Sequence, residues 1–77
     1  MTAKIIKTVS QVLNTEVNVN TSQKNCDLWD SLMHIHLMIA LEEAFDISFE
    51  PEDIARMTDI GSIEQAIKRL NPSIPIG

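Results

Sequence analysis

The segment from Ser31 to Phe45 constrains the fold most strongly, because it is apolar on nearly every side when it is read with helical spacing. Its larger apolar residues fall into two adjacent stripes, Leu32, Ile35 and Ile39 in one and Leu37, Leu41 and Phe45 in the other. A helix that is apolar on most sides is central to a bundle, or it is partly exposed in order to bind something. We expect this helix to do both.

The flanking segments predict three further helices. An amphipathic stripe predicts a first helix over residues 3–13, with Thr2 as its N-cap and Asn14 as its end. A short helix is expected to begin at Pro51, because proline suits the first turn of a helix. A last amphipathic helix is expected to begin at Gly61 and to end before two prolines.

Residues 15–29 are rich in Asn, Thr and Ser, and they predict a long loop. The apolar residues expected to anchor this loop across the helix ends are Val17, Val19 and Leu28. Residues 71–77 are expected to form a loose tail. The predicted fold is therefore an all-α four-helix bundle in a single domain over residues 1–77, with three main helices, a short third helix and a long first loop.

The length of 77 residues weighs against an enzyme, because so small a core leaves no room for a substrate cleft with its own catalytic groups. The longest apolar run, residues 37–41, is too short to cross a membrane, and the N-terminus has no secretory signal pattern. The single cysteine, Cys26, cannot form an internal disulfide, which fits a reducing compartment. We expect a cytoplasmic monomer.

Charge is distributed unevenly along the chain. Between Asp27 and Glu64 there are ten acidic residues and one basic residue, Arg56, whereas the remainder of the chain is basic. An acidic centre repels nucleic acid and anionic lipid headgroups, and it attracts proteins with basic surfaces. We therefore expect protein partners, with no nucleic-acid binding and no membrane insertion.

The residues with the clearest chemical meaning are Asp30, Ser31 and Leu32. Asp30 is expected to cap the second helix by accepting from the backbone N–H of Leu32 or Met33. Ser31 would then be the first helical residue, at the positive end of the helix dipole, where an anion such as a phosphodiester is favoured. Taken alone, the tripeptide also fits an ordinary capped helix start.

The wider pattern is more specific than the tripeptide. Residues 40–45 read Ala-Leu-Glu-Glu-Ala-Phe at the end of the second helix, and residues 57–61 read Met-Thr-Asp-Ile-Gly before the last helix. With Asp30-Ser31-Leu32, these segments resemble the acyl carrier protein family. That family has an Asp-Ser-Leu attachment motif, a Leu-Glu-Glu-x-Phe helix end and a Thr-x-Val/Ile-Gly entry to the last helix. The resemblance spans about Leu28 to Leu70 in motif.

The resemblance implies that Ser31 receives 4′-phosphopantetheine from coenzyme A, through a separate phosphopantetheinyl transferase that uses Mg²⁺. Asp30 would position that metal ion or the serine during the modification. The arm would then hold acyl groups as thioesters, so the chain would be a non-catalytic carrier. Asp before Ser31 is more similar to fatty-acid and polyketide carriers than to peptidyl carriers. A D-alanyl or aminoacyl carrier, and an unmodified helical interaction module, remain as alternatives.

The resemblance also implies a surface that docks acyl-loading and acyl-transfer enzymes with basic patches. The residues predicted to form it are Leu32, Met33, His36, Glu42 and Glu43. Many family members have acidic residues near the positions of Met33 and His36, which this chain lacks. We therefore expect a dedicated partner that contacts Met33 through an apolar surface.

The two histidines and the cysteine of the chain do not predict a metal site. His34 and His36 are two apart, so in a helix they point to nearly opposite sides and do not converge with Cys26. We expect one exposed and one semi-buried histidine, an ordinary loop cysteine and no metal ligands. Trp29 is expected to anchor the long loop on the helices.

Overall fold

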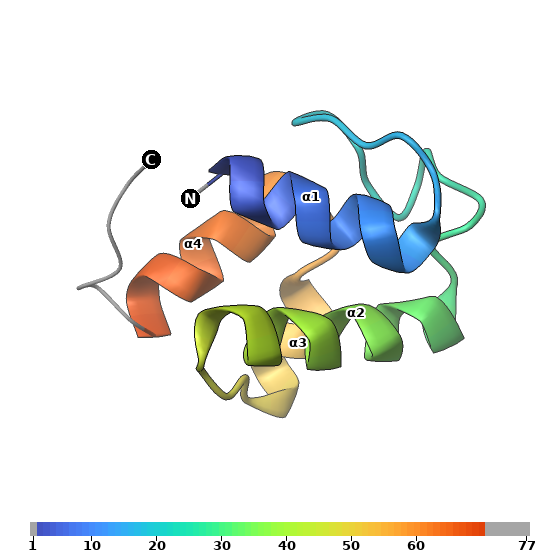
Figure 1. Ribbon diagram of the computed structural model, residues 1–77. Coiled ribbons are helices and arrows are strands. Elements are labelled where there is room, and N and C mark those ends of the chain that lie inside the picture. Colours follow the sequence, from blue (N-terminus) through green and yellow to red (C-terminus); the bar gives the residue numbers. More distant parts are fainter. Residues whose placement is uncertain (1, 71–77) are drawn as a thin grey trace.

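In the computed structural model of the chain, residues 2–70 are described, and they form four helices (Figure 1). The helices are α1 (Thr2–Leu13), α2 (Ser31–Phe45), α3 (Pro51–Arg56) and α4 (Ile60–Leu70). The predicted all-α bundle, with its short third helix and long first loop, is confirmed. The predicted tail, residues 71–77, lies outside the described residues. None of these four helices has the length and apolar character needed to cross a membrane.

The helix ends follow from local sequence. Asn14 and Asp46 adopt left-handed backbone conformations, with φ of 54° and 55°, directly after α1 and α2. Short polar side chains tolerate this conformation better than most residues, which explains why both helices end there. Thr2 was expected to cap α1 but is its first helical residue, and its hydroxyl donates to Glu64 Oε1 of α4 at 2.8 Å.

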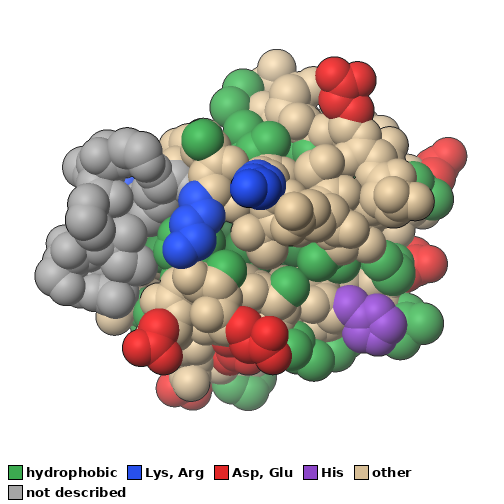
Figure 2. Space-filling view, viewed as in Figure 1, with side chains coloured by type: hydrophobic (Ala, Val, Ile, Leu, Met, Phe, Trp, Pro, Cys, Tyr) green, Lys and Arg blue, Asp and Glu red, His purple; other side chains and the backbone are tan. Residues whose placement is uncertain are grey.

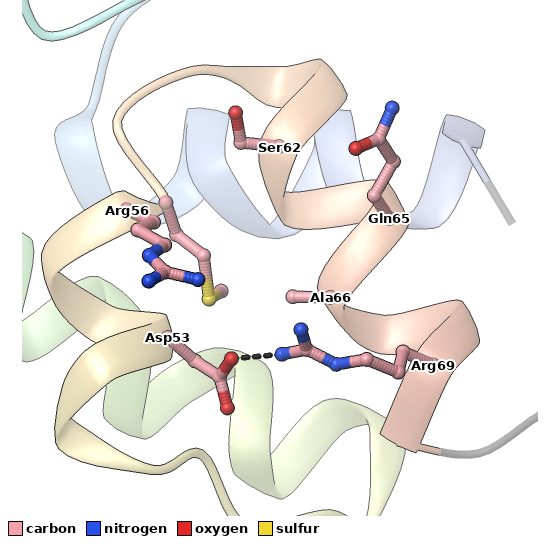
Figure 3. Close-up of a pocket in the computed structure, with 7 residues that line it drawn as sticks. Asp53, Arg56, Ser62, Gln65, Ala66 and Arg69 are labelled. Atoms are coloured by element: carbon pink, nitrogen blue, oxygen red, sulfur yellow. Dashed lines mark hydrogen bonds and ion pairs between the residues drawn. The ribbon is translucent and has the colours of Figure 1, made fainter.

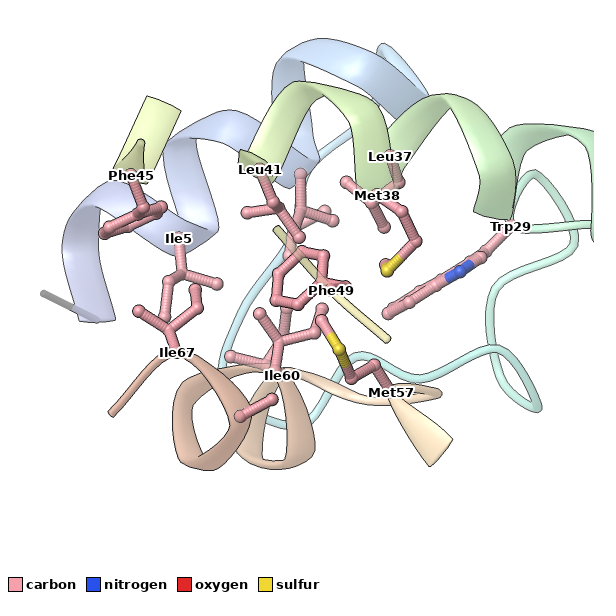
Figure 4. Packing of buried hydrophobic residues seen from close by; sticks show 14 of the residues in the cluster. Ile5, Trp29, Leu37, Met38, Leu41, Phe45, Phe49, Met57, Ile60 and Ile67 are labelled. Atoms are coloured by element: carbon pink, nitrogen blue, oxygen red, sulfur yellow. The ribbon is translucent and has the colours of Figure 1, made fainter. Parts of the chain in front are cut away.

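The core is formed by one of the two stripes of α2, packed against α1 and α4. Figure 1 shows α1 and α2 side by side and running in opposite directions. Figure 4 shows the buried side chains between the helices, which include Ile5, Leu37, Leu41, Phe45, Ile60 and Ile67. The other stripe, Leu32, Ile35 and Ile39, stays on the outside of the bundle.

The long first loop is anchored differently from the prediction. Val17 is buried, but Val19 and Leu28 are 59% and 52% exposed, so the prediction that they anchor the loop was wrong. Both lie at the outer corners of turns, which are closed by the Thr21 N–H to Asn18 carbonyl bond and the Trp29 N–H to Cys26 carbonyl bond, each 3.0 Å. The buried side chains of Thr21 and Trp29 take their place.

Backbone hydrogen bonds join this loop to the connection between α3 and α4. The Gln23 N–H donates to the Thr58 carbonyl at 2.8 Å, and the Ile60 N–H donates to the Thr21 carbonyl at 3.4 Å. An isolated bridge between Ser22 and Asp59 lies at the same place. The middle of the loop is therefore held against this connection, and the buried side chain of Trp29 anchors its end before α2.

Candidate functional site: the start of α2

Ser31 is the first residue of α2, and its side chain is exposed. The preceding residue, Asp30, caps the helix as predicted. Its Oδ1 accepts from the Met33 N–H at 2.9 Å, and its carbonyl accepts from the His34 N–H at 2.8 Å. These two bonds close the first turn around Ser31.

The site fits an attached phosphodiester. The Ser31 side chain is open to solvent at the N-terminal end of a 15-residue helix, where the helix dipole and the free backbone N–H groups favour an anion. The other serines of the described residues are Ser10, Ser22 and Ser62, which are partly buried, and Ser48, which is exposed in the connection between α2 and α3. Among the serines of residues 2–70, Ser31 is the one that combines exposure with a position at the start of a helix.

The cap makes a stability prediction that separates the geometry of Asp30 from its charge. Asp30→Asn is expected to change the free energy of unfolding by less than about 0.5 kcal/mol, because asparagine caps as well as aspartate. Asp30→Ala should lower it by about 1 kcal/mol, because the Met33 N–H loses its acceptor. Urea denaturation measures both values. Equal losses in the two variants would show that the charge stabilises the turn, and not the cap geometry.

A predicted role of Asp30 in holding a metal ion stays a prediction. Among residues 2–70 there is no group of three or more His, Cys, Asp or Glu side chains that could hold a metal ion. One carboxylate oxygen of Asp30 accepts the capping bond, which leaves the other oxygen for a metal ion. The remaining ligands would have to come from another molecule, such as the transferase or coenzyme A.

Trp29 and His34 lie beneath the first turn of α2. The indole of Trp29 is 1% exposed and points into the core on the side of Met38 and Met57 (Figure 4). Its Nε1–H donates to His34 Nδ1 at 2.9 Å, and His34 Nε2 lies 2.7 Å from the Ile54 carbonyl oxygen of α3. The predicted anchoring role of Trp29 is confirmed. His34 is buried and not half-buried as expected, whereas His36 is exposed.

An apolar face runs along the outer side of α2 from the end that begins with Ser31. We define it as Leu32, Ile35 and Ile39, which are between 49% and 64% exposed. Within α2 these residues are three and four positions apart, so they share one side of the helix. Large apolar side chains that are about half exposed and share one side of a helix are typical of an interaction surface.

The predicted docking residues are only partly brought together. Leu32, His36 and Glu43 are exposed on the outer side of α2. Met33 is half-buried and packs against the core. Glu42 is turned toward the connection between α2 and α3, where its Oε2 accepts from the Phe49 N–H at 2.7 Å. The carboxylate of Glu42 therefore binds the backbone of its own chain and is less available to a partner protein.

Acidic side chains gather at the opposite end of α2. Between Ser31 and Leu41 the helix has no acidic residue, whereas Glu42, Glu43, Asp46, Glu50 and Glu52 lie at its end and at the start of α3. Figure 2 shows acidic side chains gathered in the part of the surface where these segments lie. A 15-residue helix is about 22 Å long, so the acidic end is well separated from Ser31.

A polar pocket of about 380 Å³ lies between α3 and α4 (Figure 3). Its lining residues include Asp53, Arg56, Ser62, Gln65 and Arg69. Arg69 forms an ion pair with the buried carboxylate of Asp53, which ties α3 to α4. Ser31 does not line this pocket, so the pocket is separate from the start of α2.

The part of the chain that contains Ser31 is similar to known proteins. A family model described as "Phosphopantetheine attachment site" matches residues 3–67. A similar solved structure is the solution NMR structure of a holo acyl carrier protein from Geobacter metallireducens, with a TM-score of 0.78. Its sequence is 24% identical, and the match covers 90% of this chain and 83% of that chain, so it bears on the fold alone. No curated protein sequence matches the chain significantly.

Proposed function

This chain belongs to the phosphopantetheine attachment family, and from that premise we propose that it carries acyl groups as thioesters on an arm attached to Ser31. The prosthetic group of the chain is a covalently bound 4′-phosphopantetheine. The observation that supports Ser31 as its attachment point is an exposed serine at the first position of α2, directly after the capping carboxylate of Asp30.

The residues around Ser31 account for what the protein itself would contribute. The Ser31 oxygen would form the new bond to phosphorus, and 3′,5′-ADP would leave from coenzyme A. The N-terminal end of α2 would stabilise the resulting phosphodiester through its dipole and backbone N–H groups. Once attached, the arm supplies the thiol that holds the acyl group. The chain is proposed to act as a substrate of the transferase and to catalyse no step itself.

The experiment that tests this proposal is incubation of the protein with coenzyme A, Mg²⁺ and a promiscuous phosphopantetheinyl transferase, followed by intact mass measurement. We expect a gain of one phosphopantetheine, and fragmentation should assign it to the peptide that contains Ser31. No gain in a sample that circular dichroism shows to be helical would contradict the carrier proposal, and it would favour an unmodified interaction module.

We propose that enzymes acting on the arm dock on the apolar face of α2. This proposal is supported by the exposed side chains of Leu32, directly after the serine, and of Ile35, one turn further on. The surface of the docking enzyme would be apolar where it contacts this face, and it would have basic groups only where it reaches the acidic end of α2.

This docking surface predicts a specific pattern of transfer kinetics. Ile35→Asn and Ile39→Asn are expected to raise the KM for the transferase by about tenfold, which corresponds to about 1.4 kcal/mol of lost apolar contact. Both side chains are about half exposed, so the melting temperature should change little. Glu43→Gln is the matched control on the same side of the helix, and it should raise KM by less than about threefold.

Salt provides an independent readout of the same surface. A predominantly apolar contact is screened little, so KM should rise only slightly between low and physiological ionic strength. A steep rise of KM with salt, together with a large effect of Glu43→Gln, would contradict an apolar docking surface.

The cytoplasmic location and the monomeric state of the protein stay predictions.

A further inference from the structure

Three hydrogen bonds enclose Ser31 between Trp29 and His34. Two are the bonds of the Asp30 cap, from the Met33 and His34 N–H groups, at 2.9 and 2.8 Å. The third joins the side chains of Trp29 and His34 at 2.9 Å, from one residue before the cap to the first turn of α2. The terminal turns of helices commonly fray, so this third bond closes the segment at the point where it would open first.

The same histidine reaches α3. The indole N–H of Trp29 can only donate, so His34 Nδ1 must accept. The Ile54 carbonyl can only accept, so His34 Nε2 must carry the proton and donate, at 2.7 Å. One neutral tautomer of His34 satisfies both partners. The two rings are joined at their edges and are close to parallel, with 6.1 Å between ring centroids and 26° between the planes.

α3 is thereby held from both sides. It has only six residues, and so short a helix depends on tertiary contacts for its stability. Ile54 belongs to its last turn, where its carbonyl accepts a long bond of 3.4 Å from the Met57 N–H, and His34 Nε2 adds a shorter second bond. On the other side, Arg69 of α4 pairs with Asp53. The chain Trp29–His34–Ile54 therefore links the attachment end of α2 to a helix that is fixed to the rest of the bundle.

We infer that Trp29 and His34 are positioning residues for Ser31. This inference rests on the proposed function. By closing the first turn of α2 and tying it to α3, the pair holds the Ser31 oxygen in one place relative to the apolar face on which an enzyme would dock. A nucleophile that is already placed reacts faster once bound, so the pair should act on the rate of cofactor transfer more than on docking.

The test compares variants that cut the bonds separately. Trp29→Phe removes the donor and keeps an aromatic ring in the core. His34→Leu removes both bonds. His34→Asn keeps a side-chain oxygen close to the position of Nδ1, so it can still accept from Trp29 while it loses Ile54. Ile67→Val, in the buried part of α4, is the control for a general loss of stability.

The measurements are amide hydrogen exchange at Met33 and His34, and kcat and KM for transfer of phosphopantetheine to the full chain. We expect Trp29→Phe and His34→Leu to speed exchange at these two amides by about tenfold, because a buried polar group loses its partner. In both variants kcat should fall by about threefold or more at nearly constant KM, whereas His34→Asn, which keeps the bond to Trp29 and loses the bond to Ile54, should lie between them and the wild type. The imidazole nitrogen shifts of the wild type should show a protonated Nε2 and an unprotonated Nδ1.

Two outcomes would overturn the positioning role alone. Transfer rates that match the wild type in Trp29→Phe and His34→Leu would do so. A fall of kcat in every variant, including Ile67→Val, in proportion to lost stability would also do so, because the pair would then be structural only. A wild-type chain that gains no phosphopantetheine would instead overturn the proposed function, and this role with it.

Discussion

Substitution of Ser31 by alanine is expected to abolish the gain of phosphopantetheine completely. Alanine has no oxygen to form the bond to phosphorus, and no other described serine is both exposed and at the start of a helix. Intact mass after incubation with coenzyme A, Mg²⁺ and the transferase measures the effect. The matched control is Ser48→Ala, which removes the other exposed serine of residues 2–70 and should be modified like the wild type.

The stability of Ser31→Ala shows whether the loss of modification results from the missing oxygen or from unfolding. Ser31 is exposed, and its side chain adds little to the packing of α2, so Ser31→Ala should change the free energy of unfolding by less than about 0.5 kcal/mol. A full gain of mass in Ser31→Ala would show that the arm is attached elsewhere. In that case fragmentation of the product would identify the residue, and the proposal for Ser31 would be wrong.

Substitution of Trp29 by alanine is expected to destabilise the protein more than any surface change near the site. The indole is almost fully buried, and large-to-small substitutions of this kind cost about 3–5 kcal/mol. The loss is a large part of a total stability of about 5–15 kcal/mol for a small domain. His34 Nδ1 would also lose its donor. The midpoint of thermal unfolding should fall by about 15 °C or more.

Leu28→Ala provides the control for this result, because Leu28 is the neighbouring residue and is about half exposed. We expect it to change the free energy of unfolding by less than about 1 kcal/mol. Circular dichroism during heating measures both variants. Equal losses would mean that Leu28 helps to hold the loop after all, and that the anchoring of the loop by Trp29 has been overestimated.

Much of the fold follows from local sequence rules. The bounds of α2 are those predicted, because a capping aspartate precedes it and a residue able to adopt a left-handed conformation follows it. α3 and α4 also lie where the proline and the last amphipathic stripe place them, within a few residues. These signals are read from neighbouring residues, so they are visible in the chain before any tertiary contact is known.

Other features depend on contacts between distant residues. Helical spacing shows two apolar stripes on α2, but only the positions of α1 and α4 decide which of them is buried. The exposed positions of Val19 and Leu28 result from turns that residue type does not specify. The inward turn of Glu42 depends on the backbone of Phe49. The bond from Trp29 to His34 joins a loop to a helix, so no regular spacing would have predicted it.

The chain has one tryptophan and no tyrosine, so its intrinsic fluorescence comes from a single side chain two residues before Ser31. That indole lies in the core with its N–H bonded to an imidazole, and its emission depends on both conditions. Opening of the first turn would admit water to the ring and change the signal, whereas events at the acidic end of α2 would be too distant to do so directly. The unlabelled protein thus contains an optical reporter of the segment around Ser31, with which opening of the first turn of α2 can be followed in real time.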